Sequence, residues 1–139
     1  MKTSQAPEAA CPCGRLDVRR KPLAYAQCCG RYLDGGGTAP DAPSLMRSRY
    51  TAFVLGDEAY LLATWHTGTR PAEAKAEPGA KWLGLEVRDH RELDATHAEV
   101  EFVARYRPAA GSGPAVRLHE RSRFVREDGR WYYVDGDMH

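Results

Sequence analysis

The stretch CPCGRLDVRRKPLAYAQCCG, residues 11–30, holds every cysteine of the 139-residue chain. Core cysteines behave as small hydrophobes and would be scattered along a sequence rather than gathered in one short loop. Four thiolates brought together in this way suit Zn²⁺, a borderline-soft cation that structural sites enclose with four ligands. The pattern therefore predicts zinc as the cofactor, with four ligands: Cys11, Cys13, Cys28 and Cys29.

Two alternatives stay open for the same cysteines, namely two disulfides or free, redox-active thiols. The N-terminal sequence MKTSQAPEAA has no apolar segment of the kind found in secretory signals, which favours a reducing, cytoplasmic location where disulfides are rare. Adjacent cysteines such as Cys28 and Cys29 are also poorly placed to bond to each other. We therefore expect a cytoplasmic zinc protein.

The charge of the chain is nearly balanced, with 20 Lys and Arg against 19 Asp and Glu. A dedicated nucleic-acid binder usually carries a basic excess on one face, so nucleic acid is the less expected partner. No apolar run approaches the roughly 18 residues that a membrane span needs, so no membrane association is expected. The basic group Arg19, Arg20 and Lys21 lies between the cysteine pairs, where it offsets the negative charge of four thiolates.

Two helices are predicted after a Gly- and Pro-rich segment, residues 34–40. Asp41 can cap the first helix, and Gly56 can end it. Asp57 can cap a second helix in the sequence DEAYLLATWH, and residues 71–75 are a candidate third. The first helix carries one apolar face at helical spacing, formed by Met46, Tyr50, Phe53 and Val54.

After Gly79 the apolar residues recur with a period of two, which predicts strands. If Asp94 and Ala95 form a two-residue turn, apolar residues face one another across a hairpin, and Arg88 lies opposite Glu101. The apolar pairs of that register are Leu83 with Tyr106, Leu85 with Ala104, and Val87 with Phe102.

A second hairpin is predicted around Asp128-Gly129, the strongest short signal for a type I′ turn. A two-residue loop at this point pairs Phe124 with Tyr133, Ser122 with Asp135, and Glu120 with Asp137. The chain thus reads as an α+β fold, with N-terminal helices packed on one face of a curved four-stranded antiparallel sheet.

The motifs CPCG and CCGRYL resemble the SEC-C motif, a short zinc-binding knuckle, although the usual Ser-Gly-Lys run is absent from the longer spacer. With LMRSRYTAF, ATWH, LHERSRF and WYYVDGD, the chain resembles the YchJ-type bacterial family, which joins a SEC-C knuckle to a nuclear-transport-factor-2-like domain. The resemblance implies the fold and the metal but no reaction. We expect a disordered N-terminus (1–10), a cysteine knuckle (11–33), a linker (34–40) and the domain (41–139), with the knuckle separable from the domain.

One carboxylate interrupts the apolar side of the predicted sheet. Glu120 lies between Leu118 and Ser122, and a buried carboxylate is costly unless it is paired or protonated. Folds of the type that the chain resembles often form a small-molecule pocket on this face, and in some a carboxylate removes a proton beside a carbonyl. The candidate pocket residues are Trp65, Phe102, Leu118, Glu120 and Tyr133, and the candidate catalytic residues are Glu120, Asp135 and His66.

A structural role competes with each catalytic assignment and is preferred. Glu120 or Asp135 would form a buried ion pair with Arg47 or Arg49 of the first helix, with Arg49 the expected partner of Glu120. His66 would stabilise the end of the second helix, and His119 would face solvent. The preferred function is then a zinc-binding module, not an enzyme, that recognises a protein partner through the knuckle. The alternatives are a small-molecule-binding protein or acid/base enzyme using Glu120 and Asp135, and an RNA- or ribosome-associated protein. An open pocket would favour the small-molecule alternative, and a filled core with Glu120 bonded to arginine would favour the preferred function.

Overall fold

The computed structural model describes residues 2–76, 79–109 and 113–139. Helices come first and strands last along the chain, as the change of period predicts. The elements are η1 (a 3₁₀ turn, Tyr25–Gln27), α1 (Gly30–Leu33), α2 (Ala42–Leu55), α3 (Glu58–Ala63), β1 (Lys81–Glu92), β2 (His97–Arg107), β3 (Val116–Glu127) and β4 (Arg130–Met138).

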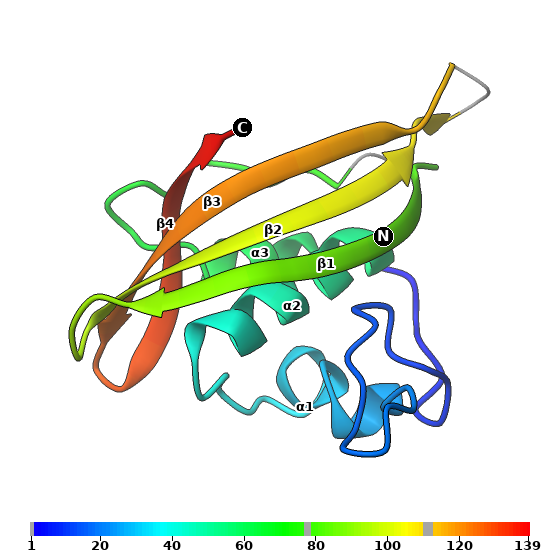
Figure 1. Cartoon of the computed structure of the whole chain (residues 1–139), viewed down its shortest axis with the longest axis horizontal. Helices are drawn as coiled ribbons and strands as arrows, with labels where there is room; N and C mark the ends of the chain where they lie inside the picture. Colours follow the sequence, from blue (N-terminus) through cyan, green and yellow to red (C-terminus); the bar gives the residue numbers. More distant parts are fainter. Residues whose placement is uncertain (1, 77–78, 110–112) are drawn as a thin grey trace.

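The four strands form one antiparallel sheet in the order β1-β2-β3-β4. Figure 1 shows the sheet as a curved layer that crosses α2 and α3, with both helices on the same side. The predicted α+β architecture is confirmed. The side of the sheet turned toward α2 is called the helix face below, and the opposite side the outer face.

Helix α2 begins and ends where local chemistry predicts. The Asp41 carboxylate accepts a hydrogen bond from the backbone N–H of Ser44 at 2.8 Å, and Gly56 follows the helix in the left-handed region at φ 73°. The helix is buried on more than its apolar face, because Ser48 and Thr51 are also fully buried. The sheet covers one side of α2, and other parts of the chain cover the rest.

Helix α3 is capped by Asp57, whose carboxylate accepts from the backbone N–H of Tyr60 at 3.1 Å. Residues 71–75, the candidate third helix, are not helical. Ala74 of this segment packs against Leu61, and Ala76 N–H donates to the Glu58 carboxylate at 3.0 Å. The third-helix prediction is wrong, since this segment bonds to α3 instead of to itself.

The first hairpin keeps the predicted register only in its middle, where Val87 pairs with Phe102 and Leu85 with Ala104. Irregularities on either side of this part change the partners. Tyr106 pairs with Trp82 instead of Leu83, and Glu101 pairs with Asp89 instead of Arg88. The turn also differs, because the His97 carbonyl accepts from the backbone N–H groups of both Leu93 and Asp94.

The second hairpin has the predicted Asp128-Gly129 turn, with φ values of 51° and 77° that a type I′ turn requires. Phe124 pairs with Tyr133 as predicted. A register shift between Arg123 and Phe124 then changes every later pair: Asp135 lies opposite Arg123, Gly136 opposite Ser122, and Met138 opposite Glu120.

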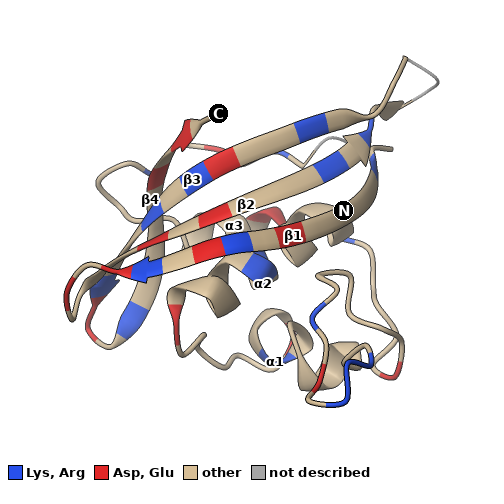
Figure 2. Cartoon of the chain, viewed as in Figure 1, with Lys and Arg blue, Asp and Glu red and all other residues tan. Residues whose placement is uncertain are grey.

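The outer face of the sheet carries ion pairs between strands, and Figure 2 shows acidic and basic residues alternating along them. Arg121 donates to Glu99 at 2.7 Å, to Asp89 at 3.0 Å and to Glu101 at 3.1 Å. These groups are partly exposed, so each pair contributes little to stability. Asp89, which the unshifted register places on the helix face, belongs to this outer network.

Residues 2–10, which the sequence predicts to be disordered, contact the rest of the chain, while Met1 lies outside the described residues. Thr3 N–H donates to the carbonyl of Leu55 at 2.6 Å, and Tyr25 N–H donates to the carbonyl of Ala9 at 2.8 Å. The Lys2 ammonium lies 3.3 Å from the Asp57 carboxylate. The segment therefore bridges the end of α2 and the cysteine knuckle.

Candidate metal centre and ligand pocket

The four cysteines converge on one buried point. All four are free thiols, and their sulfur atoms lie within 4.8 Å of one another. The Sγ atoms of Cys13 and Cys28 are 3.6 Å apart. A tetrahedral zinc site with Zn–S bonds of about 2.3 Å has sulfur–sulfur edges of about 3.8 Å. The cluster therefore fits a four-coordinate, thiolate-bound metal.

Short local elements bring the two cysteine pairs together. Gly14, at φ 75°, turns the chain after the first pair, and its N–H donates to the Cys11 carbonyl at 3.1 Å. The second pair lies between η1 and α1 and is followed by Gly30. A Cβ atom at this position would lie 2.7 Å from the carbonyl oxygen of Tyr25 and 2.9 Å from its ring. The CCG sequence thus needs its glycine because Tyr25 fills that space.

The thiols also perturb one another. The pKa of Cys11 is far below the usual thiol value, because the Cys13, Cys28 and Cys29 thiols can hydrogen-bond to its thiolate. The pKa of Cys29 is raised, because it serves as a hydrogen-bond donor to Cys11 and its other neighbours and is buried. Four thiolates at such short distances need a cation among them, as a metal site provides.

The cysteine knuckle packs directly on α2. Arg47 donates to the carbonyl of Cys13 at 3.0 Å, and Arg15 donates to the hydroxyl of Ser44 at 3.0 Å. The cysteines, Tyr25 and Tyr32 belong to the same hydrophobic core as the buried residues of α2 and the sheet. The knuckle is therefore joined to the domain by buried contacts as well as by the linker, and these contacts oppose the expected separability.

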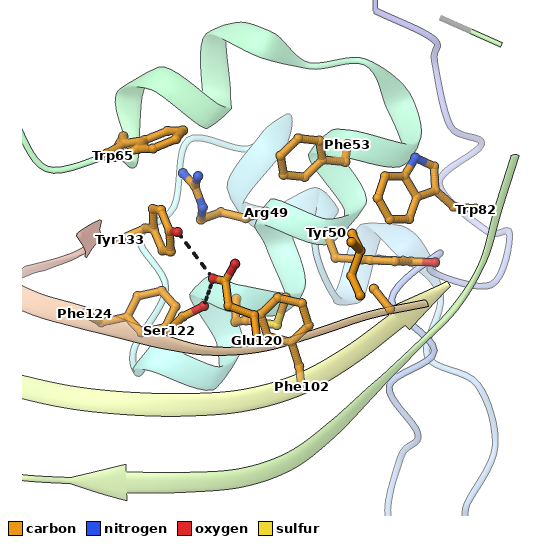
Figure 3. Close-up of a pocket in the computed structure, with 13 residues that line it drawn as sticks. Arg49, Tyr50, Phe53, Trp65, Trp82, Phe102, Glu120, Ser122, Phe124 and Tyr133 are labelled. Atoms are coloured by element: carbon orange, nitrogen blue, oxygen red, sulfur yellow. Dashed lines mark hydrogen bonds between the residues drawn. The ribbon is translucent and has the colours of Figure 1, made fainter. Parts of the chain in front are cut away.

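A cavity of about 200 Å³ lies between α2 and the helix face of the sheet. Figure 3 shows its aromatic side chains pointing toward one another from the helix and from the strands. All five residues predicted to form a pocket lie along this one cavity. Its lining comprises Met46, Arg49, Tyr50, Phe53, Trp65, Trp82, Phe102, Ala104, Leu118, Glu120, Ser122, Phe124 and Tyr133.

Glu120 is held in the cavity by two hydroxyl groups. The Ser122 hydroxyl donates to its Oε2 atom, and the Tyr133 hydroxyl donates to the same atom at 3.3 Å (Figure 3). Gly136 lies directly behind the carboxylate, where an added Cβ would overlap Oε2 and would lie 2.7 Å from Cδ. Gly136 is not among the site residues predicted from the sequence, although a glycine inside a strand is a known signal of close approach.

Arg49 enters the same cavity from α2, and its side chain is almost wholly buried at 6% exposure. Its Nη1 atom donates to the carbonyl of Leu61 at 2.8 Å and to the hydroxyl of Thr64 at 2.7 Å. The guanidinium also lies over the ring of Tyr133, 4.6 Å from its centroid. Burial lowers the pKa of Arg49 to about 10.

The predicted ion pair between Arg49 and Glu120 is wrong. No carboxylate in the described part of the chain lies within the 4.0 Å of the guanidinium that an ion pair requires. The reason is geometric: Leu61 and Thr64, at the end of α3, hold Arg49 on the helix side, while Ser122 and Tyr133 hold Glu120 on the sheet side. Arg49 follows Met46 by three residues, a spacing that places it in the apolar stripe of α2 and that could have identified it as a pocket residue.

The two other catalytic candidates lie outside the cavity lining. Asp135 is on the outer face, where its carboxylate accepts from Arg123 Nε at 2.5 Å, because the register shift turns it away from Glu120. His66 Nε2 bonds to the Glu127 carboxylate at 2.8 Å, and its Nδ1 accepts from Gly68 N–H at 3.0 Å. Both side chains therefore have structural partners instead of a place in the pocket.

His119 is also more constrained than the sequence predicts. It lies on the outer face, but its ring is only partly exposed and Nε2 lies 2.8 Å from the Glu101 carboxylate.

No helix in the described part of the chain is both long enough and apolar enough to cross a membrane.

Comparisons with known sequences agree with this architecture. Residues 41–136 match the family described as "YchJ, middle NTF2-like domain". A UPF0225 protein from a Polaromonas species is 68% identical over 139 residues, covering 99% of both chains. A UPF0225 protein from Bordetella parapertussis is 57% identical over 143 residues, again covering 99% of both chains.

Two solved structures are similar over nearly the whole chain. The solution structure of a SEC-C motif containing protein from Rhodopseudomonas palustris has a TM-score of 0.77 and 33% identity, covering 93% of this chain and 98% of that one. The crystal structure of a SEC-C motif containing protein from Psychrobacter arcticus has a TM-score of 0.76 and 32% identity, covering 93% and 82% respectively.

The close approach of Gly136 to Glu120 leads to a first prediction. Gly136→Ala should destabilise the fold by about 1–3 kcal/mol, because the added methyl group displaces a carboxylate held by Ser122 and Tyr133. Urea unfolding measures this cost. In a Glu120→Ala background the same substitution should cost almost nothing, and an equal cost in both backgrounds would show that Gly136 is not constrained by Glu120.

Packing of the knuckle on α2 leads to a second prediction. Chelation of the bound metal should lower the thermal midpoint of the whole domain by about 10 °C, equal to roughly 3 kcal/mol, because the cysteines share its core. Tryptophan fluorescence follows the domain alone, since all three tryptophans lie outside the knuckle. Restoring the metal should restore the midpoint. An unchanged midpoint, with metal loss confirmed by elemental analysis, would show that the knuckle is independent.

Proposed function

This chain belongs to the YchJ-type family of SEC-C motif proteins, and from that premise we propose that it binds a small molecule between α2 and the sheet, while its four cysteines hold a structural zinc ion. The observation that carries the proposal is the buried guanidinium of Arg49, which enters a partly open cavity without a carboxylate partner. The Leu61 carbonyl and the Thr64 hydroxyl accept from one nitrogen of this guanidinium, but both are neutral, so its buried charge lacks a carboxylate counter-charge among the described residues.

The cavity has the composition of a ligand site. Its walls are mostly aromatic and aliphatic, and Arg49, Glu120, Ser122 and the Tyr133 hydroxyl lie together at one end. Such a combination of an apolar pocket with a few placed polar groups is typical of small-molecule sites. The absence of the Arg49–Glu120 ion pair, together with an open cavity, supports this function over the protein-partner module that the sequence analysis prefers.

Zinc is the metal that best suits the cysteine cluster, since four thiolates favour a soft or borderline cation in tetrahedral coordination. All four positions would be filled by protein sulfur atoms, which leaves none for a water or a substrate. The metal is therefore proposed to stabilise the fold. A reduced, metal-bound cluster also suits the cytoplasmic location that the sequence predicts.

Binding without catalysis is the proposed role of the pocket. Among the described residues that line it, Glu120 is the one carboxylate, and neither candidate partner for acid/base chemistry, Asp135 or His66, lies with it. Because neither of these groups shares the cavity with Glu120, binding is proposed in preference to acid/base catalysis.

A third prediction tests the pocket. Indole and phenol should bind saturably and shift the NMR signals of the Trp65 and Trp82 indole N–H groups, which line the cavity, but not those of Trp131, which does not. Ala104→Leu should weaken binding at least about tenfold, because the larger side chain occupies ligand space. Arg105→Leu is the matched control, since Arg105 is exposed on the outer face. Equal affinity in both variants would place binding elsewhere.

A second candidate function is recognition of a protein partner through the tip of the knuckle, and one exposed apolar residue favours it. Val18 is 100% exposed at the end of a small loop closed by the bridge between Leu16 and Pro22. The Asp17 carboxylate holds the loop by accepting from the backbone N–H groups of Arg19 at 2.8 Å and Lys21 at 3.0 Å. An ordered, basic loop that presents an apolar side chain suits an acidic partner segment.

A fourth prediction tests this loop. Replacing Arg19, Arg20 and Lys21 by alanine should abolish retention of an acidic partner protein from cytosol at 0.15 M salt while leaving the metal content unchanged. The matched control removes three exposed arginines of the sheet, Arg105, Arg107 and Arg117, and should retain the partner. Equal retention by both variants would move the interface elsewhere, and retention of RNA instead of protein would favour the RNA-associated alternative.

A further inference from the structure

We infer that the ligand is a neutral aromatic compound that carries a carbonyl oxygen beside an N–H group, as in a primary aromatic amide or a lactam. The inference rests on the proposed function of the pocket and names the chemical class that the pocket takes. It follows from the shape of the cavity, the unused hydrogen-bonding atoms at one end, and the charges of the two groups that bear them.

One end of the cavity is shaped for a ring. Trp82 packs against Tyr50 with ring centroids 5.4 Å apart and against Phe53 at 5.9 Å, so these rings form an aromatic wall. Figure 3 shows them together, away from the polar group around Glu120. A volume of about 200 Å³ is below the roughly 300–1,000 Å³ of drug-sized sites, which limits the ligand to one small ring system.

The other end offers donors on one side. Arg49 uses Nη1 for Leu61 and Thr64, while its Nε and Nη2 atoms have no hydrogen-bond partner among the described residues. The indole N–H of Trp65, a second residue of the lining, is buried and likewise has no partner. The Trp65 indole N–H is thus a buried donor without a partner, which is costly, and together with the two unused Arg49 donors it favours a ligand that brings an acceptor oxygen.

The facing side offers an acceptor. The Oε2 atom of Glu120 already receives hydrogen bonds from Ser122 and Tyr133, while its Oε1 atom has no partner among the described residues. A ligand between Arg49 and Glu120 therefore meets donors on one side and an acceptor on the other. An amide edge supplies the matching pair, with its oxygen toward Arg49 and its N–H toward Glu120.

Charge selects a neutral ligand over a charged one. The guanidinium of Arg49 and the carboxylate of Glu120 carry opposite formal charges in the same cavity, so the site as a whole is balanced. A carboxylate ligand would pair with Arg49 but add a second negative charge beside Glu120, and an amidinium would do the reverse. Either would bury an uncompensated charge among aromatic side chains.

Four isosteric probes test the class directly: benzamide, benzoate, benzamidine and acetophenone. Their binding is measured by NMR titration of the full, metal-loaded chain, following the indole N–H signals of Trp65 and Trp82. Benzamide should bind at least about tenfold more tightly than benzoate and benzamidine, because both of those probes are charged, whereas benzamide is neutral and has both hydrogen-bonding groups. Acetophenone, which lacks the N–H, should bind about fivefold more weakly than benzamide.

Two variants should change the order of affinities in opposite directions. Glu120→Gln removes the negative charge and should make benzoate the tightest of the four probes. Arg49→Gln removes the positive charge and should make benzamidine the tightest of the four probes. If the Arg49→Gln variant does not fold, the result for Glu120→Gln alone decides.

The experiment distinguishes failure of the inferred ligand class from failure of the proposed small-molecule function. If the wild-type chain prefers benzoate or benzamidine, the neutral class is wrong and the pocket remains a small-molecule site. If none of the four probes shifts either tryptophan signal saturably, and indole and phenol do not either, the proposed function fails as well.

Discussion

The burial of helix α2 between two different partners is the constraint on which the rest of the structure depends. Some of its side chains contact the cysteine knuckle and others contact the sheet, and two arginines show this difference. Arg47 donates to the Cys13 carbonyl of the knuckle, whereas Arg49, two residues later, enters the pocket. A helix buried on one face alone would leave Arg47 or Arg49 in solvent. Because both sides are covered, the metal site and the pocket share one core, and a change at either site acts on the same helix.

The register of the strands decides which side chains of the sheet reach the pocket. A side chain of a strand changes face when one residue is inserted into the pairing, so a single irregularity decides which residues can reach a site. The shift between Arg123 and Phe124 sends Asp135 to the outer face and brings Gly136 against Glu120. The result is a pocket with one carboxylate in place of two.

Charged side chains have different kinds of partner on the two faces of the sheet. On the outer face Arg121 and Arg123 bond to several carboxylates each, at the cost of little desolvation. On the helix face Arg49 and Glu120 lie in one cavity but bond to separate neutral groups. Arg49 is buried and Glu120 is half-buried, and because the two charges line the same cavity without bonding to each other, a ligand can contact both, which is the physical basis for assigning a ligand to this cavity.

The sequence by itself determined the features that depend on neighbours in the chain. These are the caps at Asp41 and Asp57, the stop at Gly56, the turn at Asp128-Gly129, the cysteine cluster and the change from helices to strands. Each rests on hydrogen bonds or spacing within one element or one loop, so the residues alone specify it. Only the tertiary structure decided the partners of Arg49, Glu120 and Asp135, the contacts of residues 2–10 and the packing of the knuckle. Those depend on contacts between residues far apart in the chain, where a one-residue shift or a competing hydrogen bond changes the outcome.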